Sequence, residues 1–263
     1  MAPRNSLFLG DPIQSRPHGQ TAPDRYQHAF DWLTSGGIID FNPAASVRGP
    51  KYSVKRGKTP VLTAEEARNL LDSIAVYEID EETKLPDPAR PILIGLRDRA
   101  LIAVMVYSFA RVSAALAMKV EDYFTEGRRA WFRLHEKGGK RHEVSAHHNA
   151  ESYLDAYVEA AGVASDKKGP RFRSIDRHRK LTGRPLTSRN TLDMIKGRAK
   201  TLGLPDTICN HTFRATGITV FRQNGGTVEE AQHIANHASP KTTMLYDRSR
   251  DQITLDEVER III

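Results

Sequence analysis

Cysteine is almost absent from this chain, and long apolar runs are absent altogether. The 263 residues include one cysteine, Cys209, which excludes an internal disulfide framework and a zinc site built on cysteine pairs. We interpret Cys209 as a small core residue in a reducing compartment. The apolar patch in MAPRNSLFLGDPIQ is too short for a secretory signal, and no run reaches the length of a membrane span. The sequence therefore predicts a cytoplasmic protein without a membrane partner.

Acidic residues are fewer than basic ones. Lys plus Arg number 39 and Asp plus Glu 32, which gives a formal net charge of +7 and a pI near 9.5. The apolar fraction of 39% is ordinary for a soluble globular protein and suffices for one large core or two modest ones. The charge balance favours a polyanionic partner such as nucleic acid.

Glycine and proline divide the chain into three parts. Residues 1–45 are predicted to combine an irregular start with one amphipathic helix in DRYQHAFDWLTSGG, which stops at a glycine pair. Residues 46–60 are basic and interrupted by Gly and Pro, so we expect a linker there. Residues 61–263 form the largest part, and it opens on a capping box in which Thr63 is the N-cap and Glu66 reaches back.

Helical periodicity dominates this third part. The predicted helices cover residues 63–75, 92–110, 149–161, 187–202, 211–224 and 227–236, and a further short helix begins at Pro240. The stretch AWFRLHEKGGKRHEV differs, because aromatic and alternating residues flank a Gly-Gly turn, which indicates a β-hairpin. The predicted fold class is mainly α with a small antiparallel β-sheet, an α+β fold.

One charge, Arg111, stands inside the apolar run VMVYSFARVSAALAM. A guanidinium buried without a partner costs several kcal/mol by order of magnitude. Glu121 is the nearest acidic residue downstream, and the neighbour one helical turn away, Ala114, has no hydrogen-bonding group. We therefore expect the partner of Arg111 to be an anion from outside the chain.

Further polar residues follow Arg111 in a recognisable order. They lie in the segments EKGGKRHEV, HTFRATGIT and NHASPKTTMLYDR, and each segment alone is typical of solvated or capping side chains. Together they resemble the tyrosine recombinase, or phage integrase, family. The residues that match its signature are Arg111, Lys137, His211, Arg214, His237 and Tyr246. The resemblance covers about residues 60–250, the family's catalytic domain, while HAFDWLTSGGIIDFNPAASV resembles the last helix of its N-terminal core-binding domain.

The resemblance implies a site-specific recombinase or integrase that cleaves and rejoins double-stranded DNA through a 3′-phosphotyrosyl intermediate. It implies a homo-tetramer on paired DNA sites, no cofactor and no metal. Arg111 and Arg214 would clamp the phosphate oxygens, and the two histidines would add donors. Tyr246 would attack the phosphorus, and Lys137 would protonate the departing 5′ oxygen.

Other basic residues are candidate phosphate contacts. The candidates at the linker and the hairpin are Lys51, Lys55, Arg56, Lys58, Lys140 and Arg141. A second cluster comprises Arg171, Arg173, Arg177 and Arg179. The apolar C-terminal run ITLDEVERIII is expected to dock on another protomer or on its own domain.

Two departures from the family pattern leave alternatives open. Ala114 stands where members commonly carry a carboxylate that orients the first arginine, and most of the core-binding domain is missing. The chain could thus be a catalytically impaired DNA-binding remnant of a mobile-element integrase. A zinc site on His233 and His237 is a weaker alternative, since Ile234 replaces the glutamate of metalloproteases. Type IB topoisomerases share the active-site plan, but their spacing fits less well.

Overall fold

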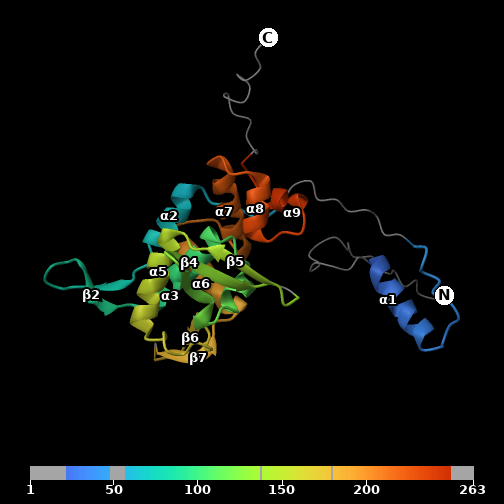
Figure 1. Ribbon diagram of the computed structural model, residues 1–263, viewed down its shortest axis with the longest axis horizontal. Coiled ribbons are helices and arrows are strands. Elements are labelled where there is room, and N and C mark those ends of the chain that lie inside the picture. Colours follow the sequence, from blue (N-terminus) through green and yellow to red (C-terminus); the bar gives the residue numbers. More distant parts are fainter. Residues whose placement is uncertain (1–21, 48–56, 137, 179, 250–263) are drawn as a thin grey trace, which may run out of the picture. The chain divides into compact units, whose positions relative to one another are not determined.

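Two compact units divide the chain between Val54 and Lys55, inside the predicted linker. The computed structural model describes residues 22–47, 57–136, 138–178 and 180–249 (Figure 1). The predicted irregular start and the C-terminal run with its docking surface lie outside the described residues.

The first unit contains one described helix, α1 (Ala22–Ser35), where the amphipathic pattern predicts one. The chain after α1 folds back along it, because the amide of Gln27 donates a 3.1 Å hydrogen bond to the carbonyl of Ala44. Trp32 and Phe41 remain 71% and 73% exposed. This unit therefore has little apolar core within its described residues.

The second unit is mainly helical. Its helices are α2 (Ala64–Asp72), α3 (Leu93–Tyr107), α4 (Val112–Leu116), α5 (His148–Ala161), α6 (Ser188–Thr201), α7 (Asn210–Gln223), α8 (Val228–Ala235) and α9 (Pro240–Tyr246), with a 3-10 turn η1 (Val120–Asp122). Its antiparallel strands are β1 (Tyr77–Ile79), β2 (Pro86–Pro91), β3 (Tyr123–Glu126), β4 (Arg129–His135), β5 (Arg141–Ser145), β6 (Arg173–Ile175) and β7 (Leu181–Pro185). The predicted fold class is confirmed. None of the helices in the described ranges is long and apolar enough to cross a membrane.

Helix α3 is the centre of the core. It is mostly apolar and is buried almost without interruption from Gly95 to Val106, a stretch that includes the buried ion pair of Arg97 with Asp98, as expected of a helix surrounded by other elements. It packs against α2, α5 and α7, and Figure 1 shows α5 running beside it. Helix α2 starts at the predicted capping box, since Thr63 and Glu66 exchange side-chain and backbone hydrogen bonds.

The predicted hairpin is present as β4 and β5, with β3 as a third strand that the sequence patterns did not predict. Phe132 pairs with Val144, and Leu134 pairs with His142. Phe132 and Leu134 are buried, because alternate side chains of a strand point to one face. The same alternation carries the buried face on to Glu136 at the end of the strand.

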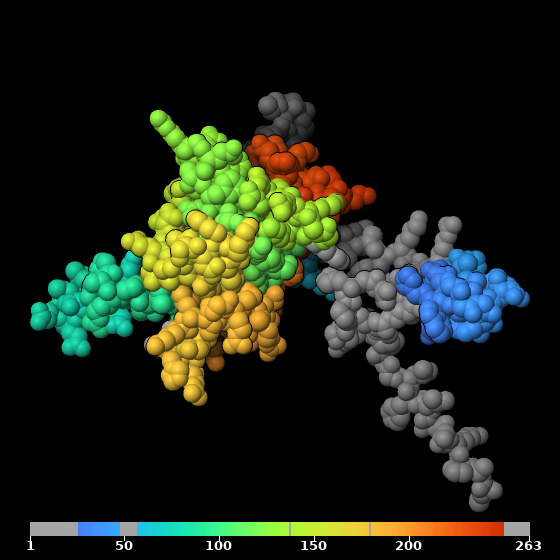
Figure 2. Space-filling model, turned by 60° about the horizontal axis from the view of Figure 1, so that its bottom comes forward, coloured from blue at the N-terminus to red at the C-terminus, as the bar shows by residue number. Residues whose placement is uncertain are grey.

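The predicted helix over 92–110 is too long, because α3 ends at Tyr107 and a short helix, α4, begins after Arg111. Phe109 between them has a left-handed backbone with φ of 52°, which an apolar periodicity cannot reveal. The hairpins β1–β2 and β6–β7 also escaped prediction, since their polar, proline-containing strands lack an apolar alternation. Figure 2 shows both projecting from the body of the domain.

Helix α7 approaches α3 closely at Gly217. A Cβ atom at this position would lie 2.1 Å from the carbonyl oxygen of Val106 and 2.7 Å from the ring of Phe109. The first neighbour is backbone and cannot rotate away. Gly217 therefore sets the distance between the two helices just where Phe109 turns the chain.

We expect Gly217→Ala to lower the free energy of unfolding by about 1–3 kcal/mol, because the added methyl group forces the helices apart. Gly197→Ala in α6 is the matched control, since no atom lies within 4 Å of its Cβ position. The control should be neutral or stabilising by up to about 1 kcal/mol. Urea denaturation of both variants measures the difference, and equal stabilities would contradict the close approach.

Candidate active site

Five of the six signature residues, His211 included, converge at one end of the second unit, where Figure 1 shows α7, α8 and α9 gathered together. Arg111 caps the start of α4, and Arg214 lies one turn into α7. His237 follows the left-handed C-cap of α8, Asn236, and Tyr246 is the last residue of α9. Residues 135 positions apart in sequence, Arg111 and Tyr246, thus belong to one site.

Arg214 is the most deeply buried cation of this site, at 1% exposure. Its Nη1 donates to the carbonyl of Phe109, and its Nη2 donates to the carbonyl of Ala235 at 2.6 Å. Burial, and secondarily the positive charge of Arg111, lower the pKa of Arg214 to about 10. Its Nε has no hydrogen-bond partner within the described parts of the chain. Arg214 is therefore a desolvated cation whose Nε–H group is available to donate a further hydrogen bond.

The partner of Arg111 corrects the expectation of an anion from outside the chain. Its Nη1 lies 2.5 Å from Oε2 of Glu136, a carboxylate 25 positions away at the end of β4. The carboxylate side chain is 5% exposed, whereas that of Arg111 is 35% exposed. The expectation failed because only sequence neighbours of Arg111 were considered, and the hairpin brings Glu136 to it.

His237 is buried and oriented by its surroundings. Its Nδ1 lies 2.9 Å from Oγ1 of Thr243, and its ring stacks on that of Tyr246 at 5.4 Å between centroids. Burial, followed by the charges of Arg214 and Arg111, lowers the pKa of His237 to about 3. The ring is thus neutral near pH 7, and its Nε2 has no partner among the residues that the structure describes.

Tyr246 lies among these side chains. Besides the stack on His237, its ring lies under the guanidinium of Arg214 at 5.6 Å and 6.5 Å from the ring of His211. His211 is exposed at the first turn of α7. The hydroxyl of Thr219 donates to the carbonyl of Tyr246 at 3.2 Å, which ties the end of α9 to α7. The ring of Tyr246 thus lies near one guanidinium and two imidazoles.

Several predicted residues fall elsewhere. Lys137, Lys51, Lys55, Arg56 and Arg179 lie outside the described residues. Lys58, Lys140 and Arg141 are exposed, as a phosphate contact requires.

Arg171 was wrongly placed among the phosphate contacts. It is 2% exposed and donates to the carbonyl of Val120, so it serves the core. Arg173 pairs with Asp166 at 2.5 Å. A basic cluster in sequence does not reveal which members point inward.

The sequence analysis missed three groups of the site: the carboxylate of Glu136, the hydroxyl of Thr243 and the carbonyl of Phe109. A signal existed for Glu136 alone, because strand alternation from Phe132 places position 136 on the buried face. A carboxylate there requires a cation.

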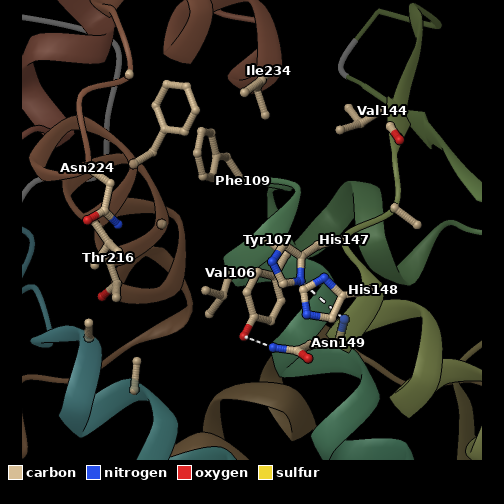
Figure 3. A pocket seen from close by; sticks show the side chains of 18 of the residues that line it. Val106, Tyr107, Phe109, Val144, His147, His148, Asn149, Thr216, Asn224 and Ile234 are labelled. Atoms are coloured by element: carbon tan, nitrogen blue, oxygen red, sulfur yellow. Dashed lines mark hydrogen bonds between the residues drawn. The ribbon is translucent and has the colours of Figure 1, made fainter.

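A separate cavity of about 1100 Å³ borders the site, lined by α2, α3, α7, α8 and β5 (Figure 3). Tyr107 stacks on His147 at 4.1 Å and accepts a 3.1 Å hydrogen bond from Asn149. Phe109 links the two places, since its side chain lines the cavity while its carbonyl holds Arg214. Arg111, Arg214 and Tyr246 do not line it.

The zinc alternative gains no further ligand. His233 lies beside His142, with 6.2 Å between ring centroids, and His237 directs Nδ1 at Thr243. Within the described ranges no three His, Cys, Asp or Glu side chains lie close enough to hold a metal ion.

Known proteins resemble this chain in sequence and in fold. The phage integrase family matches residues 61–252, which is most of the chain and contains the whole site. The chain belongs to this family. Among curated members it is 25% identical over 217 residues to the tyrosine recombinase XerD of Listeria monocytogenes serotype 4b and 28% identical over 218 residues to XerC of Herpetosiphon aurantiacus. These matches cover 82% of this chain and 66% and 64% of the two relatives.

Solved integrase-family structures share the fold. The XerH recombinase bound to a palindromic difH substrate in a post-cleavage complex superposes with a TM-score of 0.58 at 20% identity, over 82% of this chain and 55% of that one. A lambda integrase dimer bound to a COC′ core site gives 0.57 at 19% identity, over 89% and 61%. Identities this low establish the integrase fold and leave the chemistry to the site itself.

The neutral state of His237 makes the stability of this integrase-family domain depend on pH. The pKa of an unfolded histidine is about 6.5, and that of folded His237 is about 3, so between these values the unfolded state binds more protons. The free energy of unfolding therefore falls as pH decreases through this window, by about 2 kcal/mol for this residue at pH 5. His237→Gln lacks this loss.

Urea denaturation at pH 7 and pH 5 checks the expectation. The wild-type protein should lose about 2 kcal/mol more between the two pH values than His237→Gln. Equal losses in both proteins would show that His237 is protonated in the folded state.

Proposed function

We propose that this chain is a site-specific DNA recombinase whose Tyr246 attacks a phosphodiester of duplex DNA. The observation that carries the proposal is the convergence of Arg214 and His237 on one tyrosine, beside Arg111, with donors of Arg214 and His237 left without a partner in the described part of the chain. Buried donors are normally satisfied. A phosphate oxygen is the acceptor that two arginines and a neutral imidazole suit best.

The proposed reaction exchanges one phosphoester for another. The phenol of Tyr246 gives up its proton to solvent as its oxygen forms a bond to phosphorus, the bond from phosphorus to the 5′ oxygen breaks, and the protein becomes joined to the 3′ phosphate. Lys137 supplies the proton that the 5′ oxygen takes up. Because the number of phosphoester bonds is unchanged, a 5′ hydroxyl from a second strand can reverse the step, and strand exchange results.

Each described side chain has a distinct part in this proposal. The two arginines take the nonbridging oxygens and stabilise the charge that develops on them. His237 acts as a neutral donor: when Thr243 donates its hydroxyl proton to Nδ1, the proton of His237 lies on Nε2. The positive charges of Arg214 and Arg111 that contribute to the low pKa of His237, after burial, also suit the site to a phosphate anion. From the family, we also propose that a homo-tetramer carries out recombination on paired DNA sites.

A DNA-binding remnant without turnover is the competing function, and one observation speaks against its main premise. Ala114 lacks the carboxylate that orients the first arginine in relatives, yet Glu136 supplies a carboxylate to Arg111 from the hairpin. A covalent protein–DNA complex separates the two functions directly.

We expect the wild-type protein to form a covalent adduct with nicked suicide duplexes taken from DNA that flanks its gene, and Tyr246→Phe to form none. Removing one hydroxyl leaves the cations in place, so DNA affinity should stay within about twofold. Denaturing gels detect the adduct, and labelling of the released 5′ hydroxyl checks its polarity. A chelator should change neither protein.

Tyr153→Phe is the matched control, since Tyr153 lies on α5 under Arg99 and away from the site. It should form the adduct as the wild type does. An adduct that persists in Tyr246→Phe would show that another residue is the nucleophile. Wild-type protein that binds these duplexes and forms no adduct would favour the competing function, a DNA-binding remnant without turnover.

Phosphate contacts should make DNA binding steeply dependent on salt. Each neutralised phosphate releases nearly one counterion, so Lys140→Ala should reduce the slope of log K against log salt by about 0.9. Lys84→Asn, in the turn between β1 and β2, is the control, because asparagine tolerates the left-handed backbone with φ of 58° found there. Fluorescence anisotropy at several salt concentrations measures both, and an equal slope for Lys140→Ala and wild type would remove this contact.

A further inference from the structure

Glu136 occupies an unusual place for a carboxylate. It directly follows β4 and continues the buried face of that strand, its side chain is 5% exposed, and its one ion pair within the described residues is with Arg111. Its backbone N–H donates to the carbonyl of Lys140 at 2.8 Å, which closes the base of the hairpin turn. The residue is thus held by the hairpin on its backbone side and by Arg111 on its side-chain side.

Arg111 has little else to hold it. It is the N-cap of α4 but makes no side-chain capping bond, and α4 is five residues long. The residues one helical turn along α4, Ala114 and Ala115, have side chains that cannot accept a hydrogen bond. An arginine side chain carries about 2 kcal/mol of rotamer entropy, and without a carboxylate the guanidinium would sample several positions.

The pair leaves most of the guanidinium available. Only Nη1 of Arg111 is hydrogen-bonded within the described residues, and a guanidinium presents five N–H donors. The side chain remains 35% exposed, so its outer edge is open to an anion. A carboxylate bound on one edge fixes the plane of the fork that a phosphate would meet on another.

We propose that Glu136 is the positioning residue for Arg111 in DNA cleavage, and that it contacts Arg111 from the hairpin instead of from α4. The inference rests on the proposed function. Glu136 touches neither substrate nor Tyr246; it acts by holding the guanidinium where the scissile phosphate binds. Its carboxylate thereby accepts a hydrogen bond from the guanidinium of Arg111, which the side chain of Ala114 cannot do.

This role has an electrostatic signature. A carboxylate in the site opposes a phosphate, and Glu136 already acts on Arg214, whose pKa its charge raises against the larger lowering by burial. Removing the charge while keeping the shape should therefore leave DNA binding equal or tighter. The same change should slow cleavage, because Arg111 loses its orientation. A merely structural role would weaken binding and cleavage together.

The test compares Glu136→Gln with Glu143→Gln, a matched control that removes the same charge from the same hairpin. Glu143 is paired with Arg133 at 2.8 Å and is not hydrogen-bonded to Arg111. Single-turnover adduct formation on the suicide duplex should be about 10- to 100-fold slower for Glu136→Gln and unchanged for the control. Dissociation constants by anisotropy should show equal or tighter binding for Glu136→Gln.

A second variant protects the test against misfolding. Glu136→Asp keeps the charge and shortens the reach, so it should fold and cleave at a rate between those of Glu136→Gln and wild type. In an Arg111→Lys background, Glu136→Gln should add little further loss, since the orientation that it would destroy is already gone. If the losses in cleavage rate caused by the two substitutions were fully additive, the inference would be overturned.

The remaining outcomes are also decisive. A Glu136→Gln protein that cleaves as fast as wild type overturns the inference and leaves the proposed function intact. Loss of binding, thermal stability and cleavage together assigns Glu136 a structural role and overturns it as well. Wild-type protein that forms no adduct rejects the proposed function itself, before Glu136 is at issue.

Discussion

The burial of Arg214 is the constraint on which the rest of the site depends. Its guanidinium takes the carbonyl of Phe109 at the end of α3 and the carbonyl of Ala235 at the end of α8, so one side chain from α7 joins three elements. Neither carbonyl could be left in an apolar interior without a donor. The reversal of the chain at Phe109 and the end of α8 are thus set by the same cation that gives the site its charge.

Burial also decides how the charges are distributed. Burial, followed by the charge of Arg111, lowers the pKa of Arg214 to about 10, and burial, followed by the charges of Arg214 and Arg111, lowers the pKa of His237 to about 3, so that its ring is neutral. The two positive charges also repel each other. Glu136 relieves part of this repulsion from the hairpin side. In the absence of an anion, the site therefore keeps unfavourable electrostatic free energy, which a phosphate can release on binding.

Periodicity and local chemistry predicted a large part of this molecule. The capping box at Thr63, the hairpin in the segment around Gly138 and most helices of the second unit follow from patterns a few residues long. The signature also found five side chains that the fold brings together, because each segment carries its own unusual residues. The order of these segments in the chain was sufficient for the family.

Contacts between distant segments could not be predicted in the same way. Glu136 meets Arg111 only because the hairpin folds over α4, and Arg171 turns inward only because Val120 offers a carbonyl. The left-handed residue Phe109 has no sequence signal, since neither glycine nor asparagine stands there. Where backbone carbonyls determine which way an arginine side chain points, the pattern of side chains in the sequence cannot reveal that direction.

Phe109 also limits how this domain can be engineered. Its backbone conformation is unfavourable for a bulky residue by about 1–3 kcal/mol, and glycine is the usual remedy. Its ring, however, is buried at 4% exposure against Phe221 and Gly217, and losing a buried phenylalanine costs about 3–5 kcal/mol. Replacing Phe109 by glycine is therefore expected to destabilise the domain. Substitutions intended to raise its thermal stability should be made at positions whose backbone does not bind Arg214.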